Sequence, residues 1–155
     1  MKPILYISGP YSAETLIDRQ QNILDAKRRF IDALATGEWW AVCPHTHTDG
    51  LETHLPQIPH EEWLKMDITM LAGCDALWVD SDNELSDGVM LETAWAIESG
   101  MPVYYTPYIA KPGFMEDNGC DIDNRLLQFA KNNIFQMVSR GEIPDPKTYK
   151  GSALK

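Results

Sequence analysis

The sequence has few cysteines and no long apolar run, so disulfide bonds and membrane-spanning segments are not expected to stabilise or anchor the protein. Its 155 residues include three cysteines, Cys43, Cys74 and Cys120, which are widely spaced and form no CxxC pair. This usage excludes a disulfide scaffold and predicts buried free thiols in a reducing compartment. No apolar run is long enough to cross a bilayer, and the short N-terminal run ends at Gly9-Pro10 without a signal-peptide pattern. We therefore expect a cytoplasmic protein with no membrane partner.

Basic residues are also scarce. Only 13 lysines and arginines stand against 23 acidic residues, which gives a net charge of -10. Such a field repels the backbone of nucleic acids, so polymeric nucleic acid is not an expected partner. A small anionic ligand remains compatible, because the free amides at a helix N-terminus can hold a phosphate locally. The length fits one domain, which we predict over 1–143, with a loosely ordered tail at 144–155.

Several signatures of cofactor and metal sites are missing. No GxGxxG follows the first apolar run, and there is no Walker lysine, so dinucleotide or triphosphate binding has no support. No serine lies in a GxSxG elbow. The spacing of His45, His47, His54 and His60 matches no standard zinc ligand set. We predict no cofactor and no metal, and a metal-dependent hydrolase that uses His45 and His47 is the least favoured alternative.

Strand and helix signals alternate along the chain. Short apolar runs predict strands at 4–8, 39–43, 76–80 and 102–106. Apolar periodicity predicts helices at 14–36, 61–72, 87–99 and 122–139, with loops at 45–59 and 111–119. This alternation predicts an α/β fold: a three-layer sandwich with a mostly parallel, flavodoxin- or Rossmann-like sheet of four to five strands. In such sheets ligands bind at the carboxyl ends of the strands.

The most informative segment is Ser86-Asp87-Gly88-Val89-Met90-Leu91-Glu92, which follows a predicted strand and opens a helix. Ser86 or Asp87 can cap this helix, and Gly88 lets a ligand approach the backbone closely. Ser86 could equally present its hydroxyl to a sugar or a phosphate. Glu92 lies about one turn further in, where the helix dipole favours a carboxylate that can attack an anomeric carbon. The alternative is a solvated helix glutamate, which is the commoner case.

Two residues outside this segment are further candidates. Asp67 lies mid-helix among apolar neighbours, and a half-buried carboxyl group there would have a raised pKa and could protonate a leaving group. The alternative for Asp67 is an exposed helix aspartate. Tyr6 lies in the first strand, where most tyrosines are core residues with a satisfied hydroxyl.

These strings together resemble a known superfamily over roughly the first 125 residues. They are Leu5-Tyr6-Ile7-Ser8-Gly9-Pro10, then Asp67 followed by Cys74-Asp75-Ala76-Leu77, then Ser86-x-Gly88-x-x-x-Glu92-x-x-x-Ala96 with Gly100-x-Pro102-Val103. The chain resembles the nucleoside 2-deoxyribosyltransferase-like superfamily, which includes the deoxynucleoside 5′-monophosphate N-hydrolases. Proteins of that superfamily work without metal or cofactor, usually as homodimers or larger homo-oligomers.

The resemblance implies roles for individual residues. Glu92 matches the nucleophile that forms a covalent ribosyl-enzyme intermediate, Asp67 the carboxyl group that protonates the departing base, and Tyr6 a tyrosine that borders the active site. Asn124 resembles an asparagine that the transferases insert from a neighbouring subunit. The expected substrate-binding residues are Ser8, Gly9, Pro10, His45, Ser86, Asp87, Gly88 and Asn124.

The expected activity is cleavage or transfer of the N-glycosidic bond of a nucleoside, deoxynucleoside or 5′-monophosphate. Ser86 stands where the hydrolases carry a phosphate-binding serine and the transferases an aspartate, whereas Asn124 points to a transferase. Pro10-Tyr11 stands where the hydrolases carry a basic, phosphate-binding loop. Transferase and hydrolase both remain open at this point. A module of the same fold that binds nucleotides without turnover is the alternative from another functional class.

Overall fold

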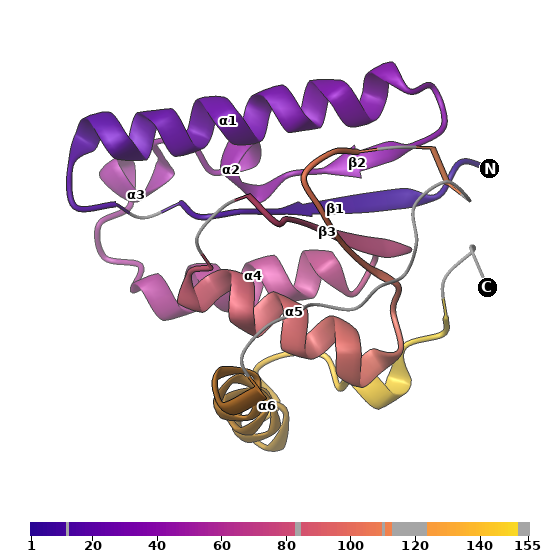
Figure 1. The fold of residues 1–155 in the computed structure, drawn as a ribbon. Helices are drawn as coiled ribbons and strands as arrows, with labels where there is room; N and C mark the ends of the chain where they lie inside the picture. Colours follow the sequence, from indigo (N-terminus) through magenta and orange to yellow (C-terminus); the bar gives the residue numbers. More distant parts are fainter. Residues whose placement is uncertain (12, 83–84, 110, 113–123, 152–155) are drawn as a thin grey trace.

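The computed structural model describes residues 1–11, 13–82, 85–109, 111–112 and 124–151 of the chain. Within them, four parallel strands form one sheet in the order β2-β1-β3-β4 (Figure 1). The strands are β1 (Ile4–Ser8), β2 (Trp40–Val42), β3 (Ala76–Asp80) and β4 (Val103–Thr106). The predicted α/β fold with a flavodoxin- or Rossmann-like parallel sheet is therefore confirmed.

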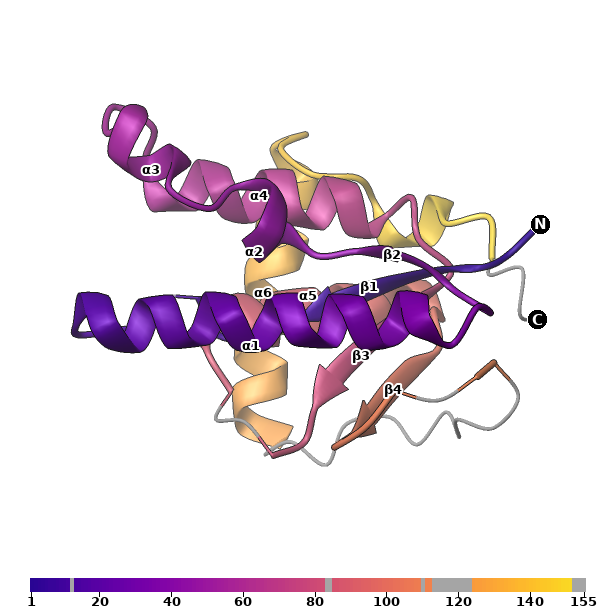
Figure 2. The same ribbon diagram turned by 90° about the horizontal axis from the view of Figure 1, so that it is seen from above.

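Helices cover both faces of this sheet. Helix α1 (Leu16–Ala35) lies over one face, and α4 (His60–Leu71) and α5 (Asp87–Ser99) lie under the other (Figure 1). Helix α6 (Asn124–Ser139) packs against α5 on the side away from the sheet and runs across its direction (Figure 2). In the described part of the chain, no helix is both long enough and apolar enough to span a membrane.

Strand alternation produces two separate cores. Leu5 and Ile7 of β1 face α1 and pack in one cluster with the buried Trp39 and Trp78. Tyr6, between them, faces the opposite side of the sheet and packs in a second cluster with buried residues of α4, α5 and α6. Because side chains on a strand alternate, Ser8 shares the face of Tyr6. Both hydroxyl-bearing residues of β1 are thus directed toward α5.

The segment 45–59, predicted as a loop, contains two short helices. These are α2 (Pro44–His47) and α3 (Leu51–His54), each of four residues. Proline occupies the first position of α2, where its fixed φ favours a helical turn. Gly50 precedes α3 with φ of 74°, a left-handed conformation that glycine adopts without strain. Helices this short leave no apolar periodicity in the sequence, and only their turn residues indicate them.

The segment after α6 packs against the helical layer. The sequence had predicted a loosely ordered tail at 144–155. A 3₁₀ turn, η1 (Pro146–Thr148), packs against α5. The indole Nε1 of Trp95 donates to the carbonyl of Pro144 at 2.9 Å, and the Tyr149 hydroxyl donates to the carbonyl of Cys74 at 3.0 Å. The rings of Trp95 and Tyr149 meet edge to face. These contacts hold the segment from Pro144 to Tyr149 against the helical layer.

Two of the three cysteines agree with their prediction. Cys43 and Cys74 are buried free thiols, and burial raises the pKa of the Cys43 thiol to about 11. Cys120 and residues 113–119 of the loop predicted at 111–119 lie outside the described residues.

Candidate functional site

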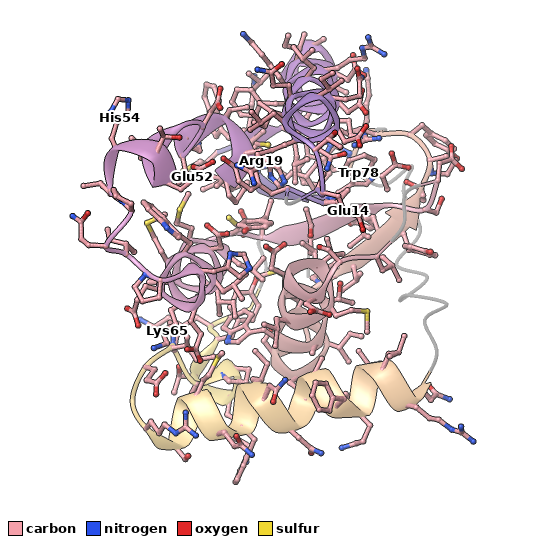
Figure 3. All side chains as sticks on the ribbon, turned by 90° about the vertical axis from the view of Figure 1, so that its left-hand side faces the viewer. Glu14, Arg19, Glu52, His54, Lys65 and Trp78 are labelled. Atoms are coloured by element: carbon pink, nitrogen blue, oxygen red, sulfur yellow. The ribbon has the colours of Figure 1, made fainter. Side chains whose placement is uncertain are left out.

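The strand order places a switch point between β1 and β3. The chain passes from β1 through α1 to β2 on one side, and then crosses to β3 on the other side. In open parallel sheets, this arrangement leaves a crevice at the carboxyl ends of the strands. A pocket of about 550 Å³ opens there. One wall comes from the β1–α1 loop, α1, α2 and α3, and the other from α4 and α5, as seen from this end in Figure 3.

Glu92 lines this pocket with both carboxylate oxygens already held. The Tyr6 hydroxyl donates to Oε1 at 3.1 Å, and the Ser8 hydroxyl donates to Oε2 at 2.5 Å. Glu92 is 7 % exposed, whereas Tyr6 and Ser8 are almost fully buried behind it. The solvated-helix alternative for Glu92 therefore does not hold. Tyr6 and Ser8 do not line the pocket, so they act on a ligand only through Glu92.

The local sequence explains how Glu92 reaches this position. Ser86 caps α5, because its side-chain oxygen accepts from the backbone N–H of Val89 at 3.3 Å. Helix α5 is buried over most of its circumference, as its nearly continuous apolar sequence predicts. Glu92 lies in its second turn, on the side that meets the Tyr6–Ser8 face of β1. A glutamate in an apolar helix is thus tolerated because two hydroxyls satisfy it.

Asp67 faces the same pocket from α4. Its Oδ1 atom is buried and has no hydrogen-bond partner among the described residues. Burial raises the pKa of the Asp67 carboxyl to about 7. Burial and the charge of Asp67 together raise the pKa of Glu92 to about 8, against the lowering effect of the hydrogen bonds from Ser8 and Tyr6. Both carboxyl groups therefore have pKa values raised toward neutral pH, and the charge of Asp67 contributes to the shift of Glu92.

Unpartnered polar atoms collect in this one pocket. Among the described residues, the buried side-chain atoms without a hydrogen-bond partner are Nε of Arg19, both ring nitrogens of His45, Nε1 of Trp63 and Oδ1 of Asp67. All four residues line the pocket. Each such atom costs about 1–3 kcal/mol, and in native structures it calls for an explanation such as a catalytic role. Their concentration here makes the pocket the candidate ligand site.

His45 is a neutral group in the pocket wall. It is 6 % exposed, and its ring meets that of Tyr11 edge to face at 5.3 Å between centroids. Burial lowers the pKa of its imidazole, the backbone of Pro10 and Gly9 acts in the opposite direction, and the charge of Arg29 lowers it further. A neutral imidazole can both donate and accept a hydrogen bond.

The opening of α5 has a structural role besides its place in the pocket. Ser86, Asp87 and Gly88 all line the pocket. A Cβ atom at Gly88 would lie 3.2 Å from Cδ2 of Leu64 on α4. Gly88 therefore permits the close approach of α4 and α5, in addition to any approach of a ligand to the backbone.

A family comparison covers the part of the chain that forms this site. The model of one protein family matches residues 3–106, from the start of β1 to the end of β4. The chain belongs to DUF7768, a domain of unknown function. No curated protein and no solved structure matches the chain. The DUF7768 match includes Glu92, Asp67, Tyr6 and Ser8, whereas α6 and the C-terminal segment lie beyond it.

The DUF7768 structure brings together most of the residues that the sequence singled out. Pocket-lining residues from that set are Gly9, His45, Asp67, Ser86, Asp87, Gly88 and Glu92. Pro10 does not line the pocket, and Tyr6 and Ser8 lie behind Glu92. Asn124 is exposed at the start of α6, also outside the lining. A ligand contact from Asn124 would have to be made in a second copy of the chain.

Among the pocket residues that were missed from the sequence, three contact one another. Arg19 of α1 and Glu52 of α3 form a loose ion pair, with 3.8 Å between Nη1 and Oε1, and the Tyr11 hydroxyl donates to Oε1 of Glu52. Figure 3 shows Arg19 and Glu52 side by side between α1 and α3. They come from separate elements, so no spacing in the sequence links them. The sequence feature that could have indicated these residues is the tyrosine directly after Gly9-Pro10, followed by charged residues.

The histidines do not form a metal centre in the described part of the chain, where no group of three or more His, Cys, Asp or Glu side chains is placed to hold a metal ion. His45 and His60 line the pocket, whereas the ring of His47 packs near Phe30. The residues present are better suited to acid–base and nucleophilic chemistry by carboxyl groups.

Proposed function

We propose that this DUF7768 protein cleaves or transfers the N-glycosidic bond of a nucleoside through a covalent ribosyl–Glu92 intermediate. One observation carries the proposal. A buried carboxyl group, held on both oxygens by Tyr6 and Ser8, faces a ligand-sized pocket together with a second carboxyl group, Asp67. The resemblance of the strings around Tyr6, Asp67 and Glu92 to the nucleoside 2-deoxyribosyltransferase-like superfamily supports the same chemistry.

In the first step, a carboxylate oxygen of Glu92 attacks the anomeric carbon of the sugar. The C–N bond breaks, its electron pair stays on the base nitrogen, and Asp67 donates a proton to the base. The transition state resembles an oxocarbenium ion, which a nearby carboxylate stabilises and then captures. Tyr6 and Ser8 fix the orientation of the attacking carboxylate, which keeps the reacting atoms aligned.

The hydrogen bonds favour the protonation state that this step needs. Burial favours the protonated form of both carboxyl groups, but only Glu92 receives two hydroxyl hydrogen bonds, which act in favour of its ionised form. The pKa of Glu92, about 8, is still the higher of the two, so in the ligand-free pocket Glu92 holds the carboxyl proton, which must pass to Asp67 before Glu92 attacks.

In the second step, water or a second base attacks the anomeric carbon of the ribosyl ester. The bond to Glu92 breaks, its carboxylate is restored, and Asp67 accepts the proton of the attacking nucleophile. Two displacements at one carbon give net retention of configuration. Water as nucleophile makes the protein a hydrolase, and a base makes it a transferase.

The charges of the pocket favour a neutral nucleoside over a 5′-monophosphate. Its described lining contains four acidic residues, Glu52, Asp67, Asp87 and Glu92, and one arginine, Arg19. The amides at the start of α5 could hold a phosphate, but Asp87 at that helix start opposes a dianion there.

An assay for release of free base tests this function. Wild type, Glu92→Gln and the control Glu98→Gln would be incubated with nucleosides and 5′-monophosphates, with and without an acceptor base. Glu98 is on the same helix but partly exposed, paired with Lys131. We expect base release by wild type and Glu98→Gln, and a loss of at least about 1,000-fold in Glu92→Gln, because the nucleophile is absent.

Undiminished base release by Glu92→Gln would contradict the proposal. Saturable binding of a nucleoside with no product, even after long incubation, would favour the binding module instead. A new nucleoside formed only with the acceptor base would establish a transferase.

We also propose that the active form is a homodimer or larger homo-oligomer. Asn124 is exposed, and on the same helix Leu126, Phe129 and Phe135 each expose more than half of their surface. An apolar surface of this kind is typical of a contact between subunits. Sedimentation equilibrium would measure the mass, and a strictly monomeric active protein would contradict this assignment.

A further inference from the structure

Arg19 and Glu52 lie at the outer part of the pocket that holds Glu92. Their side chains are 34 % and 32 % exposed, whereas Glu92 is 7 % exposed and lies at the inner end. A nucleoside whose anomeric carbon meets Glu92 must extend outward from that point. The part of it that reaches the outer pocket lies beside Arg19 and Glu52.

The chain between Glu52 and Asp67 forms a continuous stretch of pocket wall. Pro56, Ile58 and Trp63 line the pocket between these two carboxyl groups. This wall is largely apolar and includes an indole ring, which suits the faces of a planar heterocycle. Ser86 and Gly88, at the start of α5, line the pocket on a separate element from this wall. The leaving base is therefore expected along the wall from Asp67 to Glu52, with its outer edge at Glu52.

The pair at this outer edge has unused hydrogen-bonding capacity. The 3.8 Å between Nη1 of Arg19 and Oε1 of Glu52 is too long for a hydrogen bond, so neither group is saturated by the other. Nε of Arg19 has no partner among the described residues. The Tyr11 hydroxyl, itself in the pocket lining, donates to Oε1 of Glu52 and fixes this carboxylate oxygen. A donor and an acceptor thus stand side by side.

We propose that Arg19 and Glu52 determine base specificity, with Glu52 accepting from an N–H donor of the heterocycle and Arg19 donating to the ring acceptor beside it. This inference rests on the proposed function, because it identifies the outer ligand group as the leaving base. The preferred substrates are neutral heterocycles with an amino group beside a ring nitrogen. A heterocycle that lacks the amino group leaves the Glu52 carboxylate without a partner in the complex, which weakens binding.

Calorimetric binding of free bases tests the pair independently of catalysis. Two matched probe pairs are used, adenine against purine and cytosine against 2-hydroxypyrimidine, since each pair differs by one amino group. Glu52→Met removes the acceptor and Arg19→Met removes the donor while both keep an unbranched chain. The control is Glu62→Gln, which changes the same charge on an exposed part of α4. The matching nucleosides are assayed for turnover in parallel.

We expect wild type and Glu62→Gln to bind the amino base of at least one pair about tenfold or more tightly than its partner. In Glu52→Met that ratio falls to within about twofold, and Arg19→Met weakens both bases of the pair by a similar factor. An unchanged ratio in Glu52→Met, unchanged affinities in Arg19→Met, or no binding of any base would each overturn the inference. Selective base binding without turnover of any nucleoside would instead overturn the proposed function and leave the specificity pair standing.

Discussion

Ser8 donates its hydroxyl hydrogen to Oε2 of Glu92 at 2.5 Å, which joins the end of β1 to the interior of α5. The contact depends on strand alternation, because Ser8 lies two residues after Tyr6 and so faces the same helix. This hydrogen bond lowers the pKa of Glu92 and so opposes the effect of burial. The most deeply buried carboxyl group of the pocket is thereby held in one orientation.

Ser8→Ala should therefore lower activity without abolishing it. We expect kcat/KM to fall about 10- to 100-fold, because one of two orienting hydrogen bonds is lost. The bond from Ser8 lowers the pKa of Glu92, so its removal raises that pKa and moves the acidic limb of the pH–rate profile to higher pH. The measurement is kcat/KM between pH 5.5 and 9. Ser8→Thr, which keeps the hydroxyl, serves as the control, and an unshifted acidic limb in Ser8→Ala would speak against an orienting role.

Asp67→Asn should have an effect that depends on the leaving group. A base that leaves as an anion needs the proton of Asp67, and we expect a loss of about 100- to 10,000-fold with such substrates. An N7-methylated purine already carries a positive charge and needs no protonation. With its nucleoside, Asp67→Asn should retain activity within about tenfold of wild type. Equal losses with both substrates, measured as rates of base release, would exclude Asp67 as the general acid.

The burial of Glu92 should make stability depend on pH. Its pKa is about 8 in the folded protein, against the ordinary glutamate value of 4.5 in the unfolded chain. Between these values the folded state keeps a proton that the unfolded state has released, so the free energy of unfolding decreases as pH rises through this range. Glu92→Gln lacks this group, so its free energy of unfolding should fall less with rising pH than that of wild type, by on the order of 3 kcal/mol. Urea unfolding of both proteins at pH 5, 7 and 8.5 measures this free energy. Parallel pH profiles for wild type and Glu92→Gln would refute the prediction.

A buried ion pair beside the site should matter for folding. Oδ2 of Asp80, at the end of β3, pairs with Nη2 of Arg29, and Oδ1 accepts from the backbone of Asp82 at 2.9 Å. The side chain of Asp80 is 4 % exposed and that of Arg29 is 19 % exposed. Asp80→Asn removes the charge that balances the guanidinium and should cost about 2–4 kcal/mol of unfolding free energy. The surface variant Glu98→Gln should lower the free energy of unfolding by less than about 1 kcal/mol in the same urea titration. Equal losses in the two variants would contradict a structural role for the Arg29–Asp80 pair.

The sequence predicted the elements with a strong pattern and missed contacts between separate elements. Four strands and the longer helices were found within a few residues of their bounds, because apolar periodicity extends through them. The burial of Glu92 could not be decided from the sequence, since the helix pattern alone does not show which polar position meets a hydroxyl. Asp67 was ambiguous for the same reason. Arg19 and Glu52 belong to different helices, one of only four residues, and only the tertiary structure brings them together.

The contact between Gly88 and Leu64 has a consequence for the spacing of the two carboxyl groups. Gly88 lies one turn before Glu92 on α5, and Leu64 lies one turn before Asp67 on α4. With only 3.2 Å available for a Cβ atom at Gly88, an alanine there would displace Leu64 or widen the helix crossing. The separation of the proposed nucleophile and the proposed acid thus depends on how closely α4 and α5 cross, which Gly88 permits although it carries no functional group.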